Sequence, residues 1–198
     1  MINALDDGAS GGYNGMLLSL QRRPVKGLTL NANYTWSHCI ADLTFTVNSS
    51  TANTYTNPLN RGADRGNCVT TAEDHRHIFN LTSVADTPQF SNPALRVLAS
   101  GWKVSPIVRV SSGAALTVTS GVDGALTAVG AQRPNQTLGD PYLNNGLTLL
   151  NRAAFALPAS GTLGNVGVGT VRGPLNWQFD AAVSRSFQLG ETQRFEIR

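Results

Sequence analysis

Apolar and polar residues alternate along several segments of the chain, most clearly in the ten residues LTLNANYTWS at positions 28–37. Thr, Asn and Ser occupy every second position, and the apolar or aromatic residues between them are Leu28, Leu30, Ala32, Tyr34 and Trp36. An alternation with a period of two is typical of a β-strand that has one apolar and one polar face. The pattern alone leaves open what the apolar face contacts.

Patterns of the same kind, some sharper than others, predict six strands. They lie at residues 13–22, 28–37, 75–85, 101–119, 176–187 and 193–198. The fourth strand is expected to continue past a glycine bulge at Gly113. It also contains Pro106, which cannot donate to a ladder and is therefore expected at a sheet edge or a bulge. No helix of ordinary length is predicted.

The connections between these strands run short, long, medium, long and short, and the long ones are residues 38–74 and 120–175. In an antiparallel up-and-down meander, both long loops then lie at one end of the sheet and the shorter turns at the other. Outer-membrane β-barrels show this asymmetry, with long extracellular loops. The sequence therefore predicts an all-β fold, residues 1–198 forming a single partial domain that is a fragment of a transmembrane β-barrel. Six strands do not close a barrel, since the smallest single-chain barrels use about eight.

The positions of the aromatic residues on this meander agree with a membrane location. Tyr34, Trp36 and Trp177 fall near the long-loop end, and Trp102 and Phe187 fall near the short-turn end. Aromatic girdles of this kind mark the two membrane interfaces. The alternative is that these residues fall at strand ends by chance in a soluble β-protein.

The polar faces of the same strands are candidates for a water-filled lumen. The residues expected to line it are Asn31, Asn33, Lys103, Arg109 and Asp180. Ordinary ion pairing within the lumen is the simpler role for the charged ones. Arg185 has the parity of Trp177, so it must snorkel at the rim or the strand must end before it.

Composition and charge exclude several other functions. Only 14% of the residues are charged and the net charge is +3, with no run of Lys or Arg, so nucleic acid is not an expected partner. No apolar run reaches the roughly 18–20 residues of a membrane-spanning helix. The first residues, MINALDDGASGG, do not resemble a signal peptide, so export is expected only if the chain is part of a longer protein.

Two cysteines, Cys39 and Cys68, are the candidates for a covalent link between loop segments. They are 29 positions apart and match no zinc motif. Either both are unpaired thiols or they form a disulfide that closes the loop, and the disulfide requires an oxidising compartment.

Other candidate sites are weak. In EDHRH, residues 73–77, His75 and His77 share a face without a third ligand, so no metal is expected and Arg76 is expected to pair with Asp74. GNVGVG and GVDG lack the flanking strand and helix of a phosphate cradle and are interpreted as turns. No catalytic arrangement of residues is present, so we expect neither an enzyme nor a cofactor.

The order of the motifs resembles one known family. The matching pieces include YNGMLLSLQRRPVKGLTLNANYTWSHCIAD, DHRHIFNLTSV, GWKVSPIVRVSSGAALTVTSG and NRAAFALPASGTLGNVGVGTVRGPLNWQFDAAVSRSFQLGETQRFEIR, which together cover nearly the whole chain. This series resembles the C-terminal barrel portion of TonB-dependent outer-membrane receptors, in particular the Oar-like group with a carboxypeptidase regulatory domain that is abundant in Acidobacteria.

The resemblance implies a large barrel of about 22 strands in the bacterial outer membrane, plugged by an N-terminal domain and driven by TonB. The implied partners are outer-membrane lipid, the plug and remaining strands, and through them TonB. We therefore expect part of a receptor that takes up an unknown substrate, with a secreted all-β adhesion or carbohydrate-binding module as the alternative.

Overall fold

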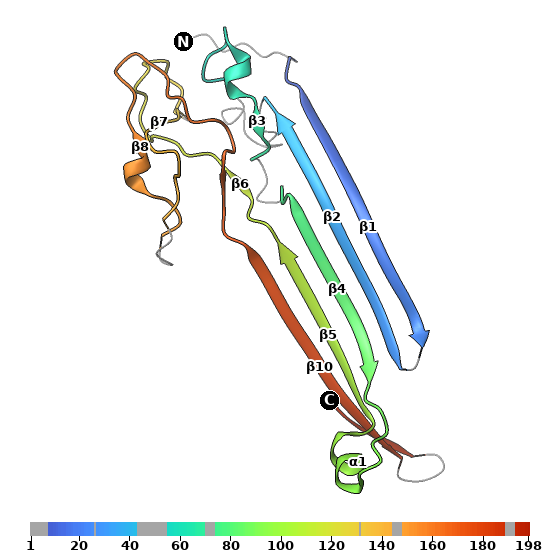
Figure 1. Ribbon diagram of the computed structural model, residues 1–198. Coiled ribbons are helices and arrows are strands. Elements are labelled where there is room, and N and C mark those ends of the chain that lie inside the picture. The colour runs from blue at the N-terminus through green and yellow to red at the C-terminus, as the bar shows by residue number, and fades with distance from the viewer. Residues whose placement is uncertain are drawn as a thin grey trace. The chain divides into compact units, whose positions relative to one another are not determined.

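The computed structural model describes residues 8–25, 27–42, 55–69, 74–130, 132–143, 148–188 and 193–198. The chain divides into two compact units (Figure 1). The strand unit comprises Met16–Trp36, His77–Ser111 and Asn176–Arg198. The loop unit comprises Met1–Gly15, Ser37–Arg76 and Ser112–Leu175.

One antiparallel sheet dominates the strand unit, and its strands are adjacent in chain order: β1-β2-β4-β5-β10-β11. Their bounds are Gly11–Val25, Leu28–Ala41, His77–Asp86, Trp102–Ser111, Asn176–Gln188 and Arg194–Ile197. β1 and β2 run on into the loop unit, where β3 (Gly66–Asn67) pairs with the end of β2. The predicted all-β, up-and-down meander is confirmed.

The register across the sheet aligns the predominantly apolar faces of neighbouring strands, although Ile78, Val84 and Ile107 lie on the other face. Tyr34 lies opposite Phe79, Phe79 opposite Val110, and Val110 opposite Trp177, which gives one row across β2, β4, β5 and β10. Because side chains alternate along every strand, this row fixes the faces of all four strands. The period-two pattern of the sequence therefore gives one sheet with a mainly apolar face and a mainly polar face.

The fourth predicted strand, 101–119, is wrong in its second half. β5 ends at Ser111, and Ala115–Leu116 forms a separate strand, β6, which pairs with β9 (Val171–Arg172) in the loop unit. At Gly113 the backbone passes so close to the carbonyl oxygen of Gly173 that any Cβ would collide with it. The glycine therefore allows a close approach of two backbone segments and is not a bulge that continues the ladder.

Pro106 lies in an interior strand and not at the predicted edge or bulge. β5 is flanked by β4 and β10, and Pro106 is opposite Ala181 of β10. On the other side, the pairing with β4 stops after Thr82↔Ile107 and resumes in the same register at Ala85↔Val104. A proline has no N–H to donate, so the ladder accommodates it as a local interruption.

A short helix, α1 (Pro93–Ala99), occupies the connection between β4 and β5, where no helix was predicted. The Asn92 side chain caps it by accepting from the amides of Ala94 (2.9 Å) and Leu95 (3.4 Å), and Pro93 stands at its first turn. Among the described residues, no helix has the length and apolar character needed to cross a membrane.

The loop unit is folded, although its residues were predicted as two long loops. Besides β3, β6 and β9 it contains η1 (Arg61–Asp64), η2 (Arg152–Ala154), and the pair β7 (Asn135–Gln136) and β8 (Phe155–Ala156). A small apolar core consists of Ala115, Ala154, Val166 and Val171. These short elements have no alternation long enough to reveal them in the sequence.

Candidate functional site

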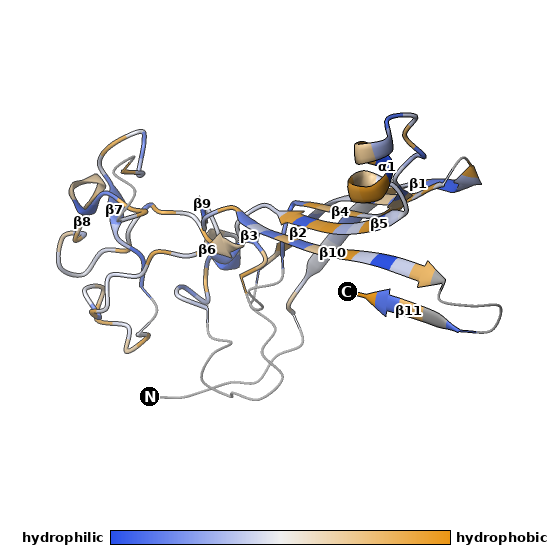
Figure 2. Cartoon of the chain, turned by 90° about the horizontal axis from the view of Figure 1, so that it is seen from below, coloured by the Kyte–Doolittle hydropathy of each residue, from blue (hydrophilic) through white to orange (hydrophobic). Residues whose placement is uncertain are grey.

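The apolar face of the sheet exposes large side chains on its outer strands β1, β10 and β11, and is half-buried along β2 and β5. Trp177 is 69% exposed and Phe179 58% exposed, although both lie within a strand. Others of this kind are Leu18, Leu20, Val183, Phe195 and Ile197. Figure 2 shows apolar and polar residues alternating along β10 and β11. Large apolar side chains exposed together on one sheet face are typical of an interface with another apolar phase.

The predicted aromatic residues lie at the two ends of this face. The row of Tyr34 and Trp177 is at the end where β2 and β5 lead into the long connections, and Trp36 lies beside it, opposite His77. The Tyr34 hydroxyl is 2.8 Å from Nδ1 of His77, and the two rings stack. Trp102 and Phe187 lie at the opposite end, next to the shorter connections.

Arg185 is on the apolar face, as its parity predicts, and it reaches out to the rim. Its guanidinium lies 5.5 Å from the ring centre of Trp102 and 4.8 Å from that of Phe187. It also donates from Nη1 to the Val97 carbonyl oxygen at 2.6 Å. The charge is thus held at the strand end by two rings and a carbonyl, in the manner of a snorkelling arginine.

The opposite face gathers the predicted lumen residues. Asn33 is opposite Asn80, Asn80 opposite Arg109, and Arg109 opposite Gln178, so a polar row crosses four strands. Asn33 accepts from Ser19 Oγ (2.7 Å) and donates to Asn31 Oδ1 (3.4 Å). Asp180 accepts from the Gln178 amide at 2.6 Å.

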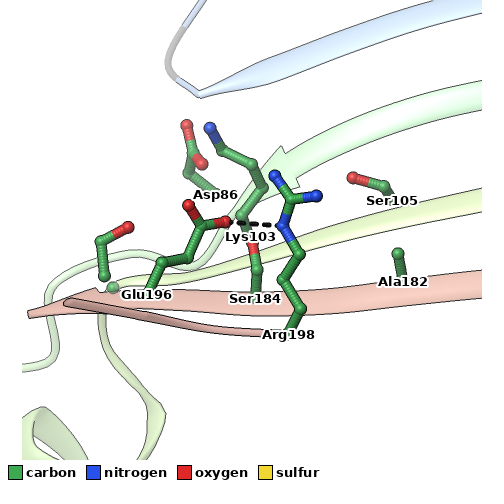
Figure 3. Close-up of a pocket in the computed structure, with 9 residues that line it drawn as sticks. Asp86, Lys103, Ser105, Ala182, Ser184, Glu196 and Arg198 are labelled. Atoms are coloured by element: carbon green, nitrogen blue, oxygen red, sulfur yellow. Dashed lines mark hydrogen bonds and ion pairs between the residues drawn. The ribbon is translucent and has the colours of Figure 1, made fainter.

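Lys103 belongs to a hollow of about 580 Å³ on this polar face. Figure 3 shows that its side chain shares the hollow with Asp86, Glu196 and Arg198. Asp86 lies opposite Lys103 in the β4–β5 register, and Arg198 Nε donates to Glu196 Oε1 at 3.0 Å. The four groups carry two positive and two negative charges, so the hollow is strongly polar with no net charge.

Cys39 and Cys68 are joined by a disulfide in the loop unit, with their Cα atoms 5.4 Å apart. The bond lies beside the pairing of β2 with β3, where Cys68 N also donates to Cys39 O at 3.2 Å. The disulfide therefore fastens the end of β2 to the segment that follows η1.

Thiol counting tests this bond in the native protein. We expect no thiol to react with an alkylating reagent before reduction and two to react afterwards in denaturant. Two reactive thiols in unreduced protein from an oxidising compartment would contradict the disulfide.

A buried ion pair that the sequence did not reveal holds together distant parts of the loop unit. Arg133 Nη1 is 2.6 Å from Asp64 Oδ1, and both side chains are less than one-tenth exposed. Asp64 also accepts from the amide (2.7 Å) and hydroxyl (2.6 Å) of Thr56. Arg133 donates further to the carbonyls of Val166 (2.7 Å) and Ala63 (2.8 Å). Every nitrogen of the guanidinium thus has a partner, and three chain segments, around residues 56–64, 133 and 166, are linked.

The expected pairing of Asp74 with Arg76 is wrong. Arg76 Nη2 donates to the side-chain oxygen of Asn67 at 3.0 Å, and the guanidinium nearest Asp74 is that of Arg172, at 3.8 Å. Desolvation lowers the pKa of Arg172, as does the nearby charge of Arg76, while Asp74 acts in the opposite direction. Over the described part of the chain, no three His, Cys, Asp or Glu side chains gather as metal ligands would.

GNVGVG is irregular backbone that ends in a turn at Val168 and Gly169, and GVDG is a bend that leads into a turn at Gly124. A Cβ at Gly164 would collide with the carbonyl oxygen of Arg133, and Gly169 has a φ of +62°. In GVDG, the Asp123 carboxylate accepts from the amides of Thr127 (2.9 Å) and Ala128 (2.7 Å). Ala128 has a φ of +60°, which is unusual for a residue other than glycine, so the carboxylate stabilises a demanding turn.

Acidification should weaken this turn. Desolvation raises the pKa of Asp123, but the hydrogen bonds from Thr127, Ala128 and the Gln132 side chain outweigh it and lower the pKa below its ordinary value. The stabilisation is therefore complete above the ordinary carboxyl range and is lost as the pH falls through the lowered folded-state pKa. We expect amide exchange at Thr127 and Ala128, corrected for intrinsic rates, to accelerate there. Asp123→Asn should remove this pH dependence; an unchanged profile in that variant would contradict the assignment.

Comparison with known proteins gives one match. A family model described as "Outer membrane beta barrel domain" matches residues 1–198. No curated protein and no solved structure matches the chain.

Proposed function

We propose, from the premise that this chain belongs to the outer membrane beta barrel domain family, that it forms part of the barrel of a TonB-dependent receptor. The family places the chain in the bacterial outer membrane. In the proposed barrel the apolar sheet face lies toward lipid and the polar face toward the lumen. The alternative of a secreted module is not retained, because the family match spans residues 1–198.

The polar face of the sheet is the observation that carries the proposal. Asp180 lies inside β10, Arg109 lies two residues before the end of β5, and Lys103 lies in the hollow near the start of β5. In a barrel of about eight strands, side chains fill the interior, whereas barrels of about 22 strands have a lumen wide enough for a plug. A polar face that carries charged side chains favours the wide barrel, because a narrow interior is filled by side chains.

The series of sequence motifs supports the finer assignment to TonB-dependent receptors. In the proposed receptor this chain is passive: it supplies the wall, the lumen surface and folded loops, and it catalyses nothing. The partners are outer-membrane lipid, the remaining strands and plug, and TonB acting through the plug. The substrate is set by the loops and the plug.

Two measurements on the full-length protein test the proposal. We expect it to bind the periplasmic domain of TonB from the same bacterium, and to conduct almost no ions in a planar bilayer because the plug closes the lumen. A variant without the TonB-binding segment is the control for binding. A steady open conductance together with no TonB binding would identify a diffusion pore and contradict the proposal.

A further inference from the structure

The connection between β4 and β5, residues 87–101, exposes three large apolar side chains on α1. Leu95 is 48% exposed, Val97 67% and Leu98 71%, and no residue of the helix is buried. Figure 2 shows the helix as a strongly apolar element on one side of the sheet. In water, such a helix loses the burial that normally stabilises helices of this length.

The connection is nevertheless tied together by specific hydrogen bonds. Ser100 is 3% exposed, and its hydroxyl accepts from the amide of Phe90 at 3.0 Å. Arg96 folds back to donate from Nε to the Phe90 carbonyl at 3.0 Å. Gly101, with a φ of +76°, returns the chain to β5. A segment built in this way holds Leu95, Val97 and Leu98 outward in a defined arrangement.

The helix is attached to the lipid-facing side of the sheet. The Trp102 indole donates to the Leu98 carbonyl at 2.8 Å, and Arg185 donates to the Val97 carbonyl at 2.6 Å. Trp102 and Arg185 are cross-strand neighbours on the apolar face. Figure 1 shows that α1 lies beyond the ends of β4 and β5. Its exposed apolar side chains therefore extend the apolar surface past the strand ends.

The charge of the segment fits a phospholipid surface. Residues 87–101 contain one charged side chain, Arg96, and no carboxylate. The guanidinium of Arg185 adds a second positive charge at the C-terminal end of α1. Amphipathic helices with apolar side chains and basic groups lie in the plane of the headgroups.

We propose that α1 is an interfacial helix that lies in the headgroup region of the periplasmic leaflet, with Leu95, Val97 and Leu98 at the boundary of the acyl chains. Its partner is the phospholipid surface itself. The inference rests on the outer-membrane placement of the sheet, since short connections of such barrels are periplasmic, and is independent of TonB.

Spin-label accessibility in the full-length protein, reconstituted in vesicles of phosphatidylethanolamine and phosphatidylglycerol, tests the proposal. Because the native cysteines are joined, a single added cysteine carries the label at Val97→Cys. Controls are Gln89→Cys in the same connection, Ala181→Cys on the apolar face and Ala182→Cys on the polar face. We expect the Val97 label to collide more often with oxygen than with a water-soluble nickel chelate. Its depth in the bilayer should lie between the depths of the Ala181 and Gln89 labels.

The other outcomes are decisive. A Val97 label as accessible to nickel as the Gln89 label would place the helix in water, and a label shielded from both reagents would show that protein covers it; either result overturns the proposal. If the Ala181 label also shows no contact with lipid, the sheet itself is not in the bilayer. That result contradicts the outer-membrane placement on which the proposal rests, and not only the position of α1.

A second set of variants separates lipid contact from misfolding. With the label at Ala94→Cys, adding Val97→Ser and Leu98→Ser should raise nickel accessibility severalfold, whereas adding Ser91→Ala should leave it unchanged. The Ala181 label, measured in the same serine background, should keep its depth. Unchanged nickel accessibility in the serine variant would contradict the proposal.

Discussion

Replacing Arg133 by methionine destabilises the loop unit by about 3–5 kcal/mol. The substitution leaves the Asp64 carboxylate buried without its counter-charge and removes the donors to the Val166 and Ala63 carbonyls. Hydrogen exchange of residues 55–69 and 132–138 in the membrane-embedded protein measures the loss, because these segments meet at the ion pair. Arg65→Met is the matched control: Arg65 is exposed and its guanidinium donates to Ser10 Oγ at 3.0 Å, so we expect less than about 1 kcal/mol.

The double variant Asp64→Asn, Arg133→Met should recover part of this loss, because no isolated charge then remains buried. Equal exchange rates in Arg133→Met and Arg65→Met would show that the buried pair does not hold the loop unit together.

Arginine at Ala181 costs about 2–4 kcal/mol of folding free energy in a bilayer, whereas arginine at the next residue, Ala182, costs far less. Both alanines are exposed and lie near the middle of β10. Ala181 is on the apolar face, opposite Pro106, and Ala182 is on the polar face, opposite Ser105. The two variants therefore differ only in which side of the sheet receives the charge.

Denaturant titration of the full-length protein folded into vesicles gives both free energies. Ala32→Arg and Asn33→Arg repeat the comparison on β2, where we expect the same order. Similar costs on the two faces would mean that the apolar face does not meet lipid.

The faces of the sheet were predictable from the sequence because they depend on local alternation. Apolar and polar residues alternate without exception from Leu28 to Ser37. The cross-strand register then places the residues of one face opposite those of the same face on the neighbouring strand. The same parity placed Arg185 on the apolar face, so its charge was expected either to reach the rim or to lie beyond the end of the strand. The sheet face and strand end of the predicted aromatic and polar residues followed from alternation and strand order alone.

The remaining features depend on contacts between distant residues. β5 ends at Ser111 because the backbone at Gly113 must pass Gly173, which lies 60 positions further on. Arg133 and Asp64 are 69 positions apart, and nothing near RPN in the sequence indicates the pairing. For α1, the Asn92-Pro93 step was an available local signal, but a helix of seven residues is too short to show a clear period.

The separation of the two groups of aromatic residues can be compared with the thickness of a membrane. Trp177 and Phe187 of β10 are ten residues apart, which corresponds to about 33 Å along a strand at about 3.3 Å per residue. A strand tilt of about 40° shortens this distance to about 25 Å across the bilayer, which is the height of the apolar band of outer-membrane barrels. With these aromatic residues at the two interfaces, we expect the protein to fit a thin hydrocarbon layer, and lipids with longer acyl chains to compress around it or lose contact with one aromatic group.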